Sequence, residues 1–106
     1  MSDRWVEKFK KEALPKLEKE FKPEKVLVFG SRAKGVARED SDIDVIVISS
    51  YFGDIPFLKR MPLVLRTVQF PKHVDYICYT AEEYERLKKE SSVIMDAEEN
   101  SIEIRA

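Results

Sequence analysis

Several features of secreted, membrane-spanning and nucleic-acid-binding proteins are missing from this 106-residue sequence. It has one cysteine, Cys78, so it cannot form an internal disulfide, which is typical of a protein in a reducing compartment. No apolar run approaches the roughly 20 residues of a transmembrane helix, and the N-terminus has no signal-like pattern. These absences predict a cytoplasmic protein that does not bind a membrane.

An excess of positive charge is missing too. The chain has 19 lysine and arginine residues against 20 acidic ones, for a net charge of −1. Proteins that bind nucleic acid regardless of its sequence usually carry a basic surplus, so such binding is not expected here. Lysines between positions 8 and 19 alternate with glutamates, and this pattern favours a solvated helix face with salt bridges over a nucleic-acid patch.

Length and composition predict a single domain over residues 1–106. With 43% hydrophobic residues, a chain of this length can bury one modest core, and it has no repeats or linkers. Apolar residues recur every three or four positions from Trp5 to Phe21, which predicts an amphipathic helix over residues 3–21. Pro15 is expected to kink or split this helix, and Pro23 to help end it.

The rest of the chain alternates between strand-like runs and helical patterns, which is typical of an α/β (α+β) fold. We expect a small mixed β-sheet flanked by helices. Thr80, with Glu83 three residues later, predicts a capping box for a helix from Ala81 toward Asp96. The other expected elements follow a βαβ succession: strand 25–29, helix near 31–37, strand 42–49, loop 49–54, a crossover helix near 56–69, strand 73–79, and a short strand or tail at 101–104.

A turn that can bind an anion follows the first expected strand. The run Lys25–Phe29 is short and rich in β-branched residues, and Gly30 ends it. Glycine lets a phosphate approach the backbone, and a helical turn that starts at Ser31 would point free N–H groups toward the strand end. Ser31 adds a hydroxyl donor, while Arg32 and Lys34 add positive charge within reach of a triphosphate.

Three acidic residues supply the opposite charge. Asp42 and Asp44 are two positions apart in an expected strand, so both project from one face. Paired carboxylates repel each other unless a proton or cation lies between them, and their hard oxygens suit Mg²⁺. Asp75 is a third acid, inside a strand-like run where an acid is unusual. If the two strands are neighbours, the three carboxylates can hold two metal ions for a reaction in which pyrophosphate leaves.

Each of these residues also has a purely structural interpretation. The aspartates could be surface acids at the start of a strand or on an edge strand. Arg32 and Lys34 could be ordinary solvated helix charges. His73, the only histidine, lies at the start of a strand and is expected to be a polar bystander rather than a catalytic base.

The two motifs together resemble a known family. Gly30-Ser31, ten intervening residues and Asp42-Ile43-Asp44 match the signature of the DNA polymerase beta-like nucleotidyltransferase superfamily. Gly-Ser-Arg-Ala-Lys-Gly and Ser-Asp-Ile-Asp are similar to its minimal nucleotidyltransferase branch, although Lys34 stands where arginine is commoner. The resemblance implies that the two motif aspartates bind metal, that Asp75 assists the acceptor hydroxyl, and that Gly30-Ser31 contacts the triphosphate.

The same resemblance implies a Mg²⁺-dependent enzyme that transfers a nucleoside monophosphate, AMP from ATP, to a hydroxyl acceptor. Proteins of the minimal branch commonly pair with a small helical toxin ribonuclease of the HEPN type, act as its antitoxin and adenylylate a tyrosine on it. The acceptor surface would come from such a partner or from a second copy of this chain. Two other classes stay open: a non-catalytic module that binds nucleotide or partner, and an enzyme that modifies a small molecule such as an aminoglycoside.

Overall fold

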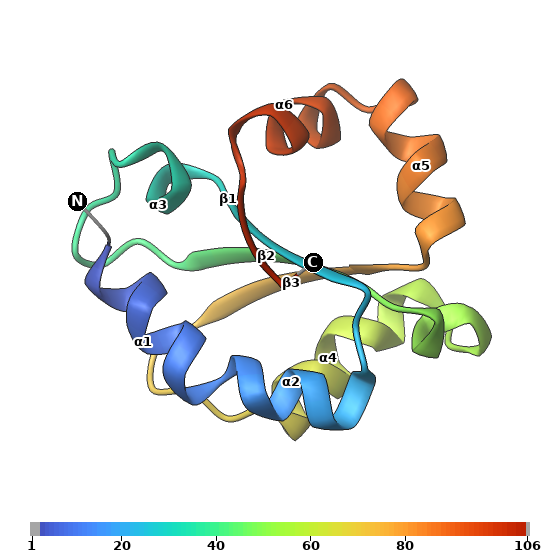
Figure 1. Cartoon of the computed structure of the whole chain (residues 1–106), viewed down its shortest axis with the longest axis horizontal. Coiled ribbons are helices and arrows are strands. Elements are labelled where there is room, and N and C mark those ends of the chain that lie inside the picture. Colours follow the sequence, from blue (N-terminus) through green and yellow to red (C-terminus); the bar gives the residue numbers. More distant parts are fainter. Residues whose placement is uncertain (1–2, 106) are drawn as a thin grey trace.

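The computed structural model describes residues 3–105, which form a β-sheet with helices on both faces (Figure 1). The elements in chain order are α1 (Arg4–Glu12), α2 (Leu14–Phe21), β1 (Lys25–Phe29), α3 (Ser31–Lys34), β2 (Ile43–Ile48), the 3₁₀ helix η1 (Ser50–Asp54), α4 (Phe57–Thr67), β3 (Val74–Tyr79), α5 (Ala81–Glu90), α6 (Ser92–Asn100) and β4 (Ile102–Arg105). The predicted fold class, a small mixed sheet flanked by helices, is confirmed.

Four strands form the sheet in the order β3-β2-β1-β4. β2 and β3 are parallel and are joined by α4, the predicted crossover helix. β1 runs antiparallel to β2, so the predicted βαβ succession is correct only for its second half. The cause is the connection between β1 and β2, whose only helix is the four-residue α3. This connection begins and ends at the same end of the sheet, so β2 runs back alongside β1. The C-terminal segment, β4, pairs antiparallel with β1 and is a strand rather than a tail.

Apolar side chains form one layer on each face of the sheet. Helices α1, α2 and α4 cover one face, around buried residues such as Phe9 and Val45. Helices α5 and α6 cover the other face, around Ile46 and Ile94 (Figure 1). Because side chains alternate along a strand, Asp44 projects to the same face as Ile46. The candidate carboxylates therefore lie on the α5 and α6 side of the sheet.

Proline and capping chemistry set where the N-terminal elements begin and end. The predicted helix over residues 3–21 is split at Ala13, as Pro15 suggested, because proline lacks an N–H and fits only the first turn of α2. The segment after β2, expected to be a loop, contains η1. The Ser49 side chain caps η1 by accepting a hydrogen bond from the N–H of Tyr51.

The C-terminal helices confirm the predicted cap but not the predicted length. Thr80 and Glu83 form the capping box that their spacing indicated. The single helix expected toward residue 96 is wrong, since α5 ends at Glu90. Ser91 has an extended backbone, and its side chain caps α6 by accepting from the N–H of Ile94.

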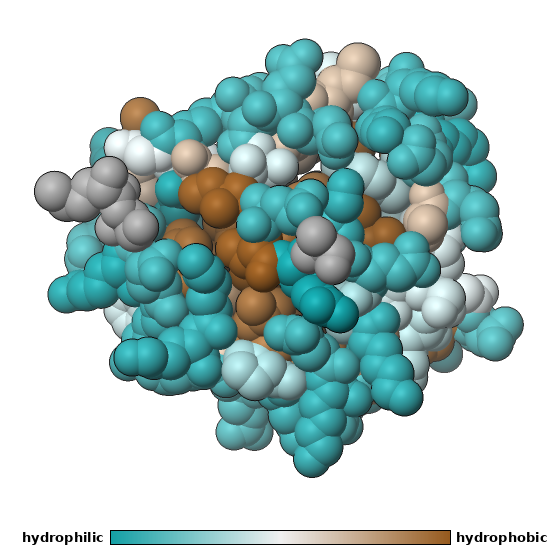
Figure 2. All heavy atoms as spheres, in the orientation of Figure 1, coloured by the Kyte–Doolittle hydropathy of each residue, from teal (hydrophilic) through white to brown (hydrophobic). Residues whose placement is uncertain are grey.

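The face of the molecule shown in Figure 2 has an apolar centre surrounded by hydrophilic side chains. This centre lies where β1 and β4 cross the view in Figure 1, and Ile102 of β4 is 40% exposed. The exposed apolar area thus lies at the β4 edge of the sheet.

No helix within residues 3–105 has both the length and the apolar composition to cross a membrane.

Candidate functional site

The candidate site lies at the end of the sheet where β1 ends and where β2 and β3 begin. Antiparallel pairing places Phe29, the last residue of β1, opposite Asp44. Parallel pairing places Asp44 beside Asp75. Since Gly30 directly follows Phe29, the glycine turn and the two acidic strands are neighbours, as their sequences predicted.

Gly30 packs directly against the Asp44 carboxylate. Its φ of +75° lies in the left-handed region that favours glycine. A Cβ at this position would lie 2.3 Å from Asp44 Oδ2, well inside van der Waals contact. Ser31 then begins α3, and the first N–H groups of a helix have no partner within it. The glycine turn and the acidic strand therefore form one continuous site.

Among the described residues, no lysine or arginine side chain balances the negative charge at this site. Burial raises the pKa of the Asp44 carboxyl group, and the Asp75 and Asp42 carboxylates raise that pKa further. Within residues 3–105, none of these three aspartates forms an ion pair with a lysine or an arginine. A divalent cation would relieve the repulsion, so the chemistry of this donor set fits Mg²⁺ or a similar ion.

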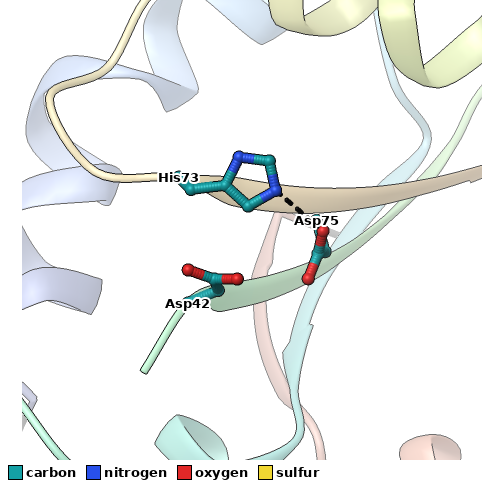
Figure 3. A group of neighbouring side chains, drawn as sticks. All are labelled: Asp42, His73 and Asp75. Atoms are coloured by element: carbon teal, nitrogen blue, oxygen red, sulfur yellow. Dashed lines mark hydrogen bonds and ion pairs between the residues drawn. The ribbon is translucent and has the colours of Figure 1, made fainter. Parts of the chain in front are cut away.

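The side chains of Asp42, His73 and Asp75 face a common space (Figure 3). One ligand atom from each of the three lies within 4.8 Å of the other two. His73 Nε2 is 2.9 Å from Asp75 Oδ1, a hydrogen bond whose donor depends on the histidine tautomer. His73, expected to be a polar bystander, therefore lies within reach of two of the candidate aspartates, and the group of three does not include Asp44.

The spacing of His73 is a sequence signal for its place beside the aspartates. His73 and Asp75 are two residues apart, which is also the spacing of Asp42 and Asp44. Side chains at this spacing share one face of a strand, and the parallel register aligns the two pairs. Two adjacent strands therefore present two rows of polar groups at the same end of the sheet.

Arg32 is placed differently from the predicted triphosphate contact. It is 5% exposed. Its guanidinium donates to both carboxylate oxygens of Asp3 and to backbone carbonyls of residues 38, 39 and 41. Arg32 thus fixes the loop that leads into Asp42, and its donors are already bound to acceptors of the protein.

Lys34, the other basic residue predicted to contact phosphate, faces α6 in this structure. Its Nζ lies 3.0 Å from Asp96 Oδ2, and both side chains are about half exposed. An exposed ion pair of this kind contributes little to stability because water competes for both charges. The ammonium group of Lys34 can therefore change partners at a small cost in free energy.

Comparison with known proteins gives a family and a similar fold. Residues 10–104 match the family model described as a nucleotidyltransferase domain. A candidate nucleotidyltransferase from Sulfolobus solfataricus, known from its crystal structure, is 26% identical to this chain, with a TM-score of 0.65. The match covers 94% of this chain and 78% of that protein. No curated protein sequence matches significantly.

Proposed function

Because this chain belongs to the nucleotidyltransferase domain family, we propose that it transfers AMP from ATP to a hydroxyl acceptor in a Mg²⁺-dependent reaction. The observation that carries the proposal is the contact between the Gly30 turn and Asp44, which itself lies beside Asp75. A turn able to accept phosphate oxygens thereby adjoins carboxylates that attract cations. Both halves of the proposed nucleotide and metal site would therefore lie at one end of the sheet.

The carboxylates of Asp42, Asp44 and Asp75 would hold the metal. Their oxygens are hard donors, and their mutual repulsion in a partly buried site favours a bound divalent cation. When bound, Mg²⁺ supplies charge neutralisation on the triphosphate and activation of the acceptor oxygen, a task that two ions share in many phosphoryl-transfer sites. The donor set therefore suits the proposed cofactor.

Other residues would bind and orient the reactants. The backbone of Gly30 and the N–H and hydroxyl groups of Ser31 would receive triphosphate oxygens. Lys34 would exchange its exposed contact with Asp96 for a phosphate oxygen. Asp75 would accept the proton of the acceptor hydroxyl as that oxygen bonds to the α-phosphorus and the bond from this phosphorus to pyrophosphate breaks. The products are the AMP ester of the acceptor and pyrophosphate.

The proposed acceptor is a tyrosine hydroxyl on a small helical partner, a toxin of the HEPN type for which this chain would act as cytoplasmic antitoxin. The motifs Gly-Ser-Arg-Ala-Lys-Gly and Ser-Asp-Ile-Asp, which resemble the minimal branch, support this assignment. The sheet and its covering helices use most of residues 3–105, so this part of the chain holds no separate acceptor domain. The acceptor surface would belong to the partner or to a second copy of the chain.

Transfer is tested with ATP labelled at the α-phosphate, Mg²⁺ and the product of the neighbouring gene. We expect label on a tyrosine of that product. Asp42→Asn and Asp44→Asn should each slow transfer at least about 100-fold because each removes a charge that binds the metal. Asp54→Asn changes an exposed acid of η1, at the far end of β2, and should keep the wild-type rate as a matched control.

The same assay distinguishes the other outcomes. Unchanged transfer in both site variants would refute the carboxylate metal site. A partner that binds without becoming labelled would indicate a docking module, and label on a small molecule alone would indicate a different class of acceptor. Circular dichroism of each variant checks that a lost activity does not reflect a lost fold.

A further inference from the structure

His73 provides a nitrogen donor beside the carboxylates of the site. Its side chain is 51% exposed, and its ring faces the same space as Asp42 and Asp75 (Figure 3). One ligand atom from each residue lies within 4.8 Å of the other two. Two donors bound to one ion at about 2.1 Å each can be at most about 4.2 Å apart. Small side-chain rotations would therefore let all three residues bind a single ion.

The charges around these three residues favour a cation. Asp44, on the same face of the sheet, adds a third carboxylate next to Asp75. In the part of the chain that the structure describes, no lysine or arginine pairs with any of the three aspartates. Lys72 is adjacent to His73 in the sequence, but its Nζ donates to the carbonyl of Glu39 instead. A cation can therefore enter without displacing a lysine or an arginine, and it would replace the contact between His73 Nε2 and Asp75 Oδ1.

The type of donor decides which cation is favoured. Mg²⁺ prefers oxygen ligands and keeps several of its waters, whereas imidazole nitrogen binds first-row transition-metal ions more strongly. Two carboxylates and one imidazole also leave coordination positions for water or a phosphate oxygen. His73 thus changes an all-oxygen site into a mixed one.

We propose that Asp42, His73 and Asp75 form a mixed oxygen and nitrogen site that binds a first-row transition-metal ion as well as Mg²⁺, and that His73 strengthens the binding of the transition-metal ion more than that of Mg²⁺. The consequence for catalysis rests on the proposed nucleotidyl transfer, whereas binding of the ion does not. The expected ligand is a divalent cation with affinity for imidazole, bound where the triphosphate can reach it.

The composition of the chain makes the test specific, because a single histidine means that any protein imidazole bound to metal must be His73. Tag-free protein with Mn²⁺ is measured by electron spin-echo envelope modulation. We expect modulation from a coordinated imidazole ¹⁴N, and its loss in His73→Gln. In calorimetric titrations, His73→Gln should weaken Co²⁺ binding about 10-fold or more and Mg²⁺ binding less than about threefold.

Asp54→Asn is the control for these measurements and should keep the modulation and both affinities. Bound Mn²⁺ without nitrogen modulation would overturn the proposal, as would an absence of Mn²⁺ binding. Equal weakening of Co²⁺ and Mg²⁺ binding in His73→Gln would overturn it as well, since His73 would then only position Asp75. Nitrogen modulation without AMP transfer would support the metal site and count against the proposed function. AMP transfer without nitrogen modulation would support the proposed function and overturn the metal site.

Discussion

Two separate properties require glycine at position 30. The backbone φ is +75°, and a Cβ would lie 2.3 Å from Asp44 Oδ2. Gly35 at the end of α3 has the same φ, but a Cβ there would meet nothing within 4 Å. Substitution at Gly35 therefore strains the backbone without crowding a neighbour, whereas substitution at Gly30 strains the backbone and also crowds the Asp44 carboxylate.

We expect Gly30→Ala to reduce activity much more than Gly35→Ala. Gly35→Ala should cost about 1–2 kcal/mol of stability because Gly35, with ψ of 20°, is in the left-handed helical conformation, and Gly30→Ala should cost at least as much because Gly30, with ψ of −155°, is in a region essentially restricted to glycine. Only Gly30→Ala should also displace Asp44, and a misplacement near 1 Å can slow a reaction about 100-fold. Urea denaturation measures the first effect, and initial rates of AMP transfer measure the second. Equal activity losses in the two variants would contradict a role for the contact with Asp44.

The relative positions of single residues could be predicted where they depend on spacing within strands. Asp44 and Asp75 are neighbours because their strands have the alternation and length that the sequence indicated. Arg32 marks the limit of such reasoning. The groups that bury it are Asp3 and backbone carbonyls of the loop at residues 38–41. Backbone acceptors in a loop depend on conformation rather than residue type, so no sequence pattern reveals them.

At the scale of elements, Arg60 links α4, β3 and α5. It is 4% exposed, and its guanidinium donates to the carbonyls of Ile55 and Cys78 and to both carboxylate oxygens of Glu83. The hydrogen bonds from Arg60 lower the pKa of Glu83 below its ordinary value of 4.5, against the opposite effect of burial. The pair therefore stabilises the packing of α5 on the rest of the fold while Glu83 is ionised.

Glu83→Gln should lower the unfolding free energy by about 1–3 kcal/mol at neutral pH, because buried Arg60 loses its charged partner. The folded-state pKa of Glu83 lies below 4.5, so its contribution is complete above that pH and is lost as the pH falls through the folded-state value. Denaturation curves should show that the difference in unfolding free energy between wild type and Glu83→Gln narrows as the pH falls below 4.5. Glu82→Gln, an exposed neighbour, is the control. A difference in unfolding free energy between wild type and Glu83→Gln that stays constant with pH would rule out this explanation.

Element boundaries could be predicted where local chemistry acts alone. The capping box at Thr80 and Glu83 and the break near Pro15 were both predicted, because each depends on residues within one turn. The break between α5 and α6 was missed. Ser91 followed by apolar residues is a helix N-cap signal, but a continuous helical pattern over residues 81–96 concealed it.

At the scale of the whole molecule, the site depends on combining two kinds of strand pairing. The predicted βαβ succession would make β1 parallel to β2 and would place Gly30 and Asp44 at opposite ends of the sheet. Antiparallel pairing brings the end of β1 to the beginning of β2, and parallel pairing adds the beginning of β3. The sequence predicted that these groups converge but not the strand direction that allows it, because direction depends on how the chain folds back after α3.

Ligands at this end of the sheet should stabilise the whole fold, since β1, β2 and β3 all contribute to the site. A ligand at 100 times its Kd adds about 2.7 kcal/mol to the unfolding free energy. For a chain of this size that is a rise in Tm of roughly 10 °C or more. Differential scanning calorimetry with Mg²⁺ and a nonhydrolysable ATP analogue should show this rise in wild type and Asp54→Asn and only a small rise in Asp42→Asn. A full rise in Asp42→Asn would mean that nucleotide binds without the carboxylate site.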